Sequence, residues 1–399
     1  MLRLKDTLHQ NTAGFLEQAV RTAEYYGFQP VDSLPRTPRR RHDAQKPKVP
    51  TRLQDLLLAR KDERTLFSSA KLCLSCTRQP ERPLLLWRVT EAVSRNTNTP
   101  CAALEFHVIG TPHAVAEALL IVVTNAIAED AGIGKRTVSI NSIGSLDSSN
   151  RFLRDVSGFL RKHIETISPT LRPRAATDPL GTLIQLFERG HPAVPRAPAA
   201  TEYLTEEERR RFWELLEYLE VFGVPYELDP AILGSHNFWS HTLFEVSAFD
   251  EETGSRIPFA SGGRYDPLAT RLAGALTPAV VVTIMCESRG RSTLKREAKR
   301  MPALYFAHLG PEARRRLLPT LELLRHSNIP VHQSLMFERL GEQMEHARET
   351  GATHLLIMGH KEAVEGTVLV REVATNSQEA ILIQELPSYL RRYRIATRA

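Results

Sequence analysis

Apolar residues recur at helical spacing early in the chain and give way to strand-like runs further on. From Phe15 to Tyr26 they follow at three- and four-residue steps, which predicts a helix over residues 11–26 that Gly27 ends. A second long helix is expected over residues 114–132. Runs of apolar and β-branched residues predict strands over residues 84–89, 104–109, 137–141, 242–248 and 279–284.

The pattern divides the rest of the chain into a helical stretch and a mixed one. Residues 150–222 are expected to be mostly helical, with proline-rich breaks at 169–179 and 192–198 and a surface helix over residues 206–222. From residue 302 onward, strand-like and helix-like segments alternate, which is typical of a compact α/β domain.

Composition excludes several classes of protein. The chain has 399 residues, 42% of them hydrophobic and 25% charged, so it is not a fully disordered chain, a collagen or a coiled-coil rod. No apolar run is long enough for a transmembrane helix, and the N-terminus lacks the apolar core of a signal peptide. Four cysteines do not make a disulfide framework. We therefore expect a cytoplasmic protein with reduced thiols and no membrane partner.

The net charge of +6 permits contact with nucleic acid without requiring it. Basic residues gather in a proline-rich segment over residues 36–48 and in a second segment over residues 289–300. Such groups suit phosphate contacts, although a solvated loop explains the first segment as well. Arg314 to Arg316 share one predicted helix and are interpreted as a solvated face. The candidate RNA-binding residues are Arg39, Arg40, Arg41, Lys295, Arg296 and Arg300.

Several motifs in fixed order resemble one family. Residues 242–245 read Thr-Leu-Phe-Glu, residues 260–268 read Ala-Ser-Gly-Gly-Arg-Tyr-Asp-Pro-Leu, and residues 276–280 read Leu-Thr-Pro-Ala-Val. Together with Glu-Phe-His at residues 105–107, this order resembles histidyl-tRNA synthetase, a class II aminoacyl-tRNA synthetase. The C-terminal run at residues 351–359 resembles the anticodon-binding domain of that family.

The resemblance implies an α+β fold. It places a class II core with an antiparallel sheet at about 1–298, a helical insertion at about 145–222 within it, and an anticodon-binding-like α/β domain at 302–399. Because family members are homodimers, it also implies a homodimer.

The family's chemistry depends on arginines that stabilise charge on the α-phosphate of ATP. At the three matching positions this chain has Ser94, Gly234 and Ser288, while Arg95 and Arg289 could substitute only with a one-residue shift. A Pro-Glu-Gly-Thr loop that reads the amino group of histidine in the family has no counterpart between residues 66 and 89.

Several residues of this chain match positions of the family's substrate pocket, and some of them differ from the residues that the family has there. The motif 3 glutamate Glu287 is retained. Gly262 to Asp266 are interpreted as a sharp turn with a local Arg264–Asp266 pair, or as remnants of substrate contacts. The residues of this vestigial pocket are Phe106, His107, Asn237, Phe238, Trp239, Gly262, Gly263, Arg264, Tyr265, Asp266 and Glu287.

Weaker signals add little. Cys73 and Cys76 form one Cys-x-x-Cys pair, whereas a structural zinc site normally needs four ligands, so no metal site is expected. Trp87, Trp213 and Trp239 are interpreted as core or interface residues.

These observations predict a non-catalytic histidyl-tRNA synthetase-like protein that binds tRNA or other RNA, or that acts as a regulatory partner of another protein. One alternative is an active histidine–tRNA ligase with a rebuilt site, which alone would need ATP and magnesium. Another is a regulatory subunit of an enzyme such as ATP phosphoribosyltransferase. No cofactor is otherwise expected.

Overall fold

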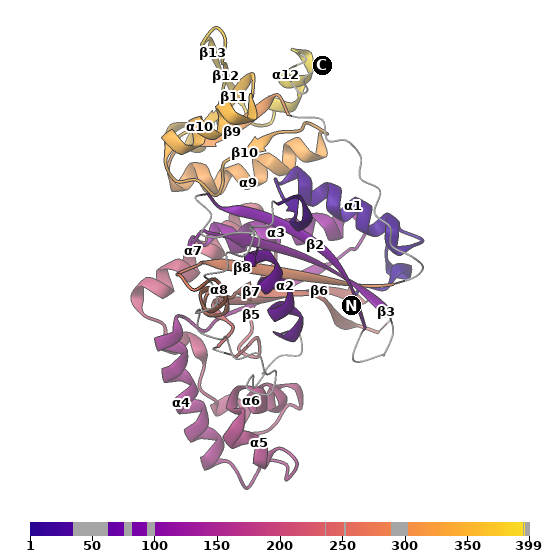
Figure 1. The fold of residues 1–399 in the computed structure, drawn as a ribbon, viewed down its shortest axis with the longest axis vertical. Helices are drawn as coiled ribbons and strands as arrows, with labels where there is room; N and C mark the ends of the chain where they lie inside the picture. The colour runs from indigo at the N-terminus through magenta and orange to yellow at the C-terminus, as the bar shows by residue number, and fades with distance from the viewer. Residues whose placement is uncertain are drawn as a thin grey trace, which may run out of the picture.

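The computed structural model describes residues 1–34, 63–75, 82–93, 100–235, 237–250, 253–288, 302–393 and 395. These residues form two sheets with helices packed on them, which confirms the predicted α+β fold class. The larger sheet lies in the middle of the molecule, between a C-terminal α/β unit and a group of three helices at the opposite end (Figure 1).

The larger sheet has eight strands in the order β1-β2-β3-β8-β7-β6-β4-β5. The pairs β1–β2 and β4–β5 at its two edges are parallel, and all other neighbours are antiparallel. Its strands are β1 (Gln29–Pro30), β2 (Leu84–Val93), β3 (Pro100–Ile109), β4 (Arg136–Ser142), β5 (Tyr226–Leu228), β6 (Ser240–Asp250), β7 (Ser255–Arg264) and β8 (Ala279–Glu287).

Three long helices cover one face of this sheet: α1 (Thr12–Tyr25), α3 (Val115–Asp130) and α7 (Glu206–Phe222). The helix α7 begins with a capping box between Thr205 and Glu208 and ends at Gly223, whose φ of 83° suits a residue without a Cβ. Its apolar side packs on α3 and on the C-terminal unit. It therefore belongs to this helical layer, whereas the sequence placed it in the helical insertion.

The opposite face carries α2 (Glu63–Ser75), α8 (Asp266–Ala273) and the three helices of the insertion. The insertion consists of α4 (Leu146–Lys162), α5 (Arg172–Thr177) and α6 (Pro179–Glu188). The predicted proline-rich break at 169–179 is thus wrong in part, because α5 lies inside it. Proline fits there because it occupies the first turn of the helix, where its missing N–H is not needed.

The C-terminal unit is built on a five-stranded sheet in the order β10-β9-β11-β12-β13. The alternation predicted from the sequence is confirmed, with one further short helix, α11, that the pattern did not indicate. Its elements are β9 (Leu304–His308), α9 (Pro311–His326), β10 (His332–Gln333), α10 (Leu340–Thr350), β11 (His354–Met358), α11 (His360–Glu365), β12 (Thr367–Glu372), β13 (Gln378–Leu382) and α12 (Leu386–Arg392).

None of the helices in the described ranges combines the length and the apolar character that crossing a bilayer requires. Trp87 and Trp239 lie in the core, as expected, whereas Trp213 on α7 is 61% exposed.

Candidate functional site: the sheet face beneath helix α2

The face of the large sheet beneath α2 and α8 carries two of the polar residues that the sequence assigned to a pocket. His107 on β3 and Tyr265, which follows β7, are both fully buried there. The Nδ1 atom of His107 lies 2.9 Å from the Oη atom of Tyr265. Burial, with a further contribution from Arg88, lowers the pKa of His107 to about 3, so its imidazole is neutral.

A buried carboxyl group lies two residues earlier on the same face of β3. Glu105 is 1% exposed, and its Oε2 atom lies 4.0 Å from the guanidinium of Arg88 on β2. Burial raises the pKa of Glu105 to about 7, although Arg88 and Ser69 oppose the shift. This part of the site thus holds a neutral imidazole beside a carboxyl group that titrates near neutral pH.

The first residue of α2 closes the neighbouring part of the site. Glu63 is fully buried, and its Oε1 atom accepts the backbone N–H of Ser235 at 2.8 Å and the indole N–H of Trp239 at 3.0 Å. These bonds tie α2 to the segment between β5 and β6.

Gly234, which the resemblance matches to an arginine of the family, has Trp239 in the space beside it. A Cβ atom at Gly234 would lie 2.4 Å from the Cδ1 atom of Trp239, too close for any side chain without a shift of the indole. Phe238 is buried next to it, with the guanidinium of Arg271 5.6 Å from its ring centroid. Trp239, Tyr265 and Cys73 belong to one apolar cluster with α2 and α8, so this region is packed as a core.

Four of the predicted pocket residues lie elsewhere. Phe106 faces the opposite side of the sheet, where its ring contacts Phe28 at 5.4 Å between centroids, because successive residues of a strand point to opposite faces. Asn237 is exposed. Glu287, at the end of β8, lies beside the N-terminal residues, with its Oε2 atom 3.3 Å from the backbone nitrogen of Leu4. Asp266 accepts the backbone N–H of Ala279 at 2.7 Å.

Arg264 also lies outside the pocket. Its side chain is fully buried and forms a two-pronged pair with Glu117 of α3, with Nε–Oε1 and Nη2–Oε2 distances of 2.9 and 2.8 Å. The expected contact with Asp266 is present at 3.3 Å. Arg211 of α7 donates to the same Glu117 carboxylate at 2.7 Å. Although burial opposes ionisation, the two arginines lower the pKa of Glu117 to about 2.

Gly262 and Gly263 do not form the sharp turn that the sequence suggested. They are the two residues that precede Arg264, the last residue of strand β7. A Cβ atom at Gly262 would lie 2.1 Å from the carbonyl oxygen of Val281, and one at Gly263 would lie 2.6 Å from that of Thr242. The physical reason for glycine is therefore the close approach of two neighbouring strands.

Two residues that organise this region, Glu63 and Glu117, were not predicted from the sequence. Residues 63–65 read Glu-Arg-Thr and share a glutamate and a threonine with the Pro-Glu-Gly-Thr loop of the family, but they lie just before the residues 66–89 in which that loop was expected. Glu117 gave no local signal, because its partner Arg264 is 147 residues away in sequence.

Several predicted residues lie outside the described ranges. These are Ser94, Arg95, Arg289, Cys76, Arg39, Arg40, Arg41, Lys295, Arg296 and Arg300. Ser288 is described, and its backbone N–H donates to the carbonyl oxygen of Pro100 at 3.0 Å. Cys73 is a buried thiol.

The prediction of a solvated basic face on α9 is wrong for two of its three arginines. Arg314 has a side chain that is 12% exposed and lies 3.8 Å from Glu338. Arg315 pairs with Glu217 of α7 at 2.9 Å, and Arg316 alone of the three is exposed. Residues 302–393 contain ten Lys and Arg against eleven Asp and Glu, so this unit is not basic as a whole.

Comparison with known proteins finds similarity to histidine–tRNA ligases. The family model of the anticodon binding domain matches residues 312–393. A histidine–tRNA ligase of Thermosynechococcus vestitus is 29% identical over 296 residues, which are 74% of this chain and 69% of that enzyme. The histidine–tRNA ligase of Geobacillus kaustophilus is 26% identical over 287 residues, 71% of this chain and 67% of that enzyme. The solved structure of apo S. aureus histidyl-tRNA synthetase aligns with 78% of this chain and 77% of its own at 21% identity, with a TM-score of 0.43.

Proposed function

The chain belongs to the histidyl-tRNA synthetase family, and within that family we propose that it is a non-catalytic tRNA-binding member. The observation that carries the proposal is the packing of Trp239 against Gly234 and Glu63. In the resemblance, the position of Gly234 belongs to an arginine that compensates charge on ATP. The indole takes the room that such a side chain would need.

Glu63 supports the same conclusion from the amino-acid side of the site. The family's tetrapeptide glutamate reads the amino group of histidine, and the matching carboxylate oxygen here accepts N–H bonds from Trp239 and Ser235 instead. A substrate ammonium group would have to compete with these two N–H donors for the Glu63 carboxylate, and breaking the buried indole hydrogen bond would cost about 1–3 kcal/mol. ATP and magnesium are therefore not expected to bind productively.

Retained tRNA binding is supported by the anticodon binding domain match and by the two basic segments at residues 36–48 and 289–300. Phosphate contacts made by Lys and Arg would give affinity that falls with salt, and the C-terminal unit would supply selectivity. We propose a homodimer, as in the family.

Two measurements test the proposal separately. Histidine-dependent exchange of pyrophosphate into ATP reports adenylate formation, and we expect none above a no-enzyme control; clear turnover would refute the non-catalytic assignment. Binding of labelled tRNA-His against other tRNAs, measured over a salt series, reports the tRNA-binding part. Selective binding that survives near-physiological salt supports it, whereas unselective binding that disappears there would refute it and direct attention to a protein partner. Light scattering would establish the oligomeric state.

A further inference from the structure

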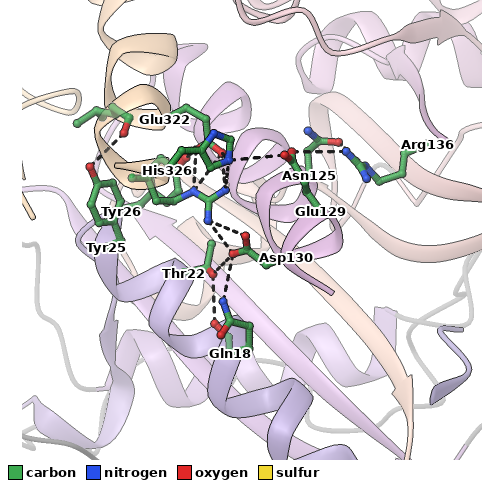
Figure 2. A network of polar contacts seen from close by, with 12 residues as sticks. Gln18, Thr22, Tyr25, Tyr26, Asn125, Glu129, Asp130, Arg136, Glu322 and His326 are labelled. Atoms are coloured by element: carbon green, nitrogen blue, oxygen red, sulfur yellow. Dashed lines mark hydrogen bonds and ion pairs between the residues drawn. The ribbon is translucent and has the colours of Figure 1, made fainter. Parts of the chain in front are cut away.

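A network of polar contacts joins three helices where the C-terminal unit meets the core (Figure 2). It comprises α1 and α3 from the core and α9 from the C-terminal unit. Its members come from sequence positions as far apart as residues 18 and 326, so it forms only when the two units dock. Nothing in the proposed tRNA-binding function depends on it.

Arg325 of α9 lies at the centre of the network. Its Nη1 atom donates to both carboxylate oxygens of Asp130, the last residue of α3, at 2.8 and 2.7 Å. Asp130 also accepts the hydroxyl of Thr22 at 2.6 Å and the amide of Gln18 at 3.4 Å, both from α1. The side chains of Arg325 and Asp130 are only 10% and 16% exposed.

A second carboxylate shares the same guanidinium. Glu322, one turn earlier on α9 and 13% exposed, accepts from the Nη2 and Nε atoms of Arg325 at 2.5 and 3.0 Å. The hydroxyl of Tyr26, next to α1, donates to Glu322. Although burial disfavours a charged guanidinium, Glu322 and Asp130 raise the pKa of Arg325 above its ordinary value. One cation thus balances two poorly solvated carboxylates, one from each unit.

The neighbouring groups do not form a metal site. Glu129, Glu322 and His326 could offer three ligand atoms within 4.8 Å of one another. However, the Nη2 atom of Arg325 lies 3.0 Å from the Nε2 atom of His326. A bound cation would therefore face a fixed positive charge at contact distance.

We propose that this network is a latch that holds the C-terminal unit on the core of its own chain, with Arg325 as the positioning residue. Without the guanidinium, Asp130 and Glu322 would face each other across the joint as two like charges with little water to screen them. The other ion pairs between the two units that the structure describes are more exposed and contribute less. Arg315 and Glu217 are 22% and 51% exposed, Arg82 and Glu345 are 36% and 64% exposed, and His326 and Glu129 are 51% and 48% exposed.

The test compares three single variants of the full chain. Arg325→Met removes the shared cation from α9. Asp130→Asn removes the carboxylate from α3 and leaves the sequence of α9 unchanged. Arg316→Met changes an exposed arginine of α9 and serves as the control. Trypsin cleavage within residues 289–301, which connect the two units and contain several Lys and Arg, reports release of the C-terminal unit. Small-angle scattering reports the overall dimensions.

We expect trypsin to cleave Arg325→Met about tenfold faster than the wild type, and we expect this variant to have a larger radius of gyration. Arg316→Met should match the wild type in both cleavage rate and radius of gyration. Hydrogen exchange within α9 should stay slow in Arg325→Met, which separates release from unfolding of the helix. The double variant Asp130→Asn/Arg325→Met should be released less than Arg325→Met, because one of the two repelling carboxylates is gone.

Wild-type cleavage and dimensions in both Arg325→Met and Asp130→Asn would overturn the latch. If hydrogen exchange in α9 becomes fast in Arg325→Met, this variant has unfolded the helix and only Asp130→Asn tests the latch. Faster trypsin cleavage of Asp130→Asn than of the wild type then supports the latch, and an unchanged rate refutes it. A double variant released more than Arg325→Met would also refute the charge balance on which the proposal rests.

Discussion

The indole N–H of Trp239 donates to the Oε1 atom of Glu63 at 3.0 Å, inside the region that the family resemblance assigns to the substrate. The two residues are 176 positions apart in sequence, and both are buried. The bond connects the start of α2 to the segment that precedes β6, so the same contact that stabilises the fold also occupies the site.

Replacing the acceptor should destabilise the protein. Glu63→Ala leaves the N–H groups of Trp239 and Ser235 buried without this acceptor, and we expect a loss of about 1–3 kcal/mol for each donor. Glu63→Gln keeps an acceptor oxygen and should lose less. Urea unfolding followed by tryptophan fluorescence measures both. Equal losses in the two variants would show that hydrogen bonding is not the reason for the effect.

Filling the space at Gly234 should also be costly. Gly234→Ala brings a Cβ atom to 2.4 Å from Trp239, and overpacking of this kind costs about 1–3 kcal/mol. Gly158 on α4 is the matched control, because a Cβ atom there meets nothing within 4 Å and alanine favours a helix. Gly158→Ala should leave stability unchanged or raise it slightly. A stable Gly234→Ala variant would mean that Trp239 moves freely.

The buried charge cluster on the other face of the sheet should be far more sensitive than a surface ion pair. Glu117→Gln leaves Arg264 and Arg211 without their shared carboxylate, and breaking a buried pair costs about 3–5 kcal/mol. Glu165→Gln makes the same chemical change at a pair with Arg172, where the glutamate is 87% exposed, and should cost under about 1 kcal/mol. Denaturant unfolding of the two variants compares them directly. Similar losses would contradict the structural role of Glu117.

The two titratable groups beneath α2 should give opposite pH dependences of stability. Glu105 has its pKa raised from 4.5 to about 7, so the folded state keeps a proton that the unfolded state releases, and stability falls as pH rises through this window. His107 has its pKa lowered from 6.5 to about 3, so the unfolded state takes up a proton that the folded state does not. Its contribution therefore falls as pH decreases below 6.5.

Single variants separate these two contributions between pH 5 and 6. In Glu105→Gln only the effect of His107 remains, so this variant should lose stability on acidification. The contribution of one such group is at most about 1.4 kcal/mol per pH unit. His107→Asn should instead gain stability on acidification over the same range. Guanidinium unfolding at the two pH values measures both slopes. Slopes of the same sign in the two variants would contradict the assignment.

Local pattern was enough to predict most of the elements. The helix at residues 11–26 and the strand at 104–109 follow from spacing alone, and the structure places α1 at Thr12–Tyr25 and β3 at Pro100–Ile109. The helix α11 was missed because six residues are too few for helical periodicity to show.

The site could be predicted only in part, because its geometry depends on contacts between distant segments. Successive residues of β3 point to opposite faces of the sheet, so His107 lies in the site and Phe106 does not. The motif match assigned both residues to the pocket because it took no account of this alternation. The partners of Arg264 and Trp239 lie more than a hundred residues away, so no local pattern could identify Glu117, and only the partial motif at residues 63–65 pointed to Glu63.

The narrow gap at Gly262 bears on what a sequence signature can say about activity. The strand β8 runs so close behind this residue that any larger amino acid would strike the carbonyl of Val281, whether or not a substrate ever binds. A descendant of an enzyme could thus abandon its reaction and still be obliged to keep the letters by which the enzyme is recognised. At this position the motif reflects common descent and the space that the backbone leaves. Whether the protein turns over substrate depends instead on the residues around Trp239.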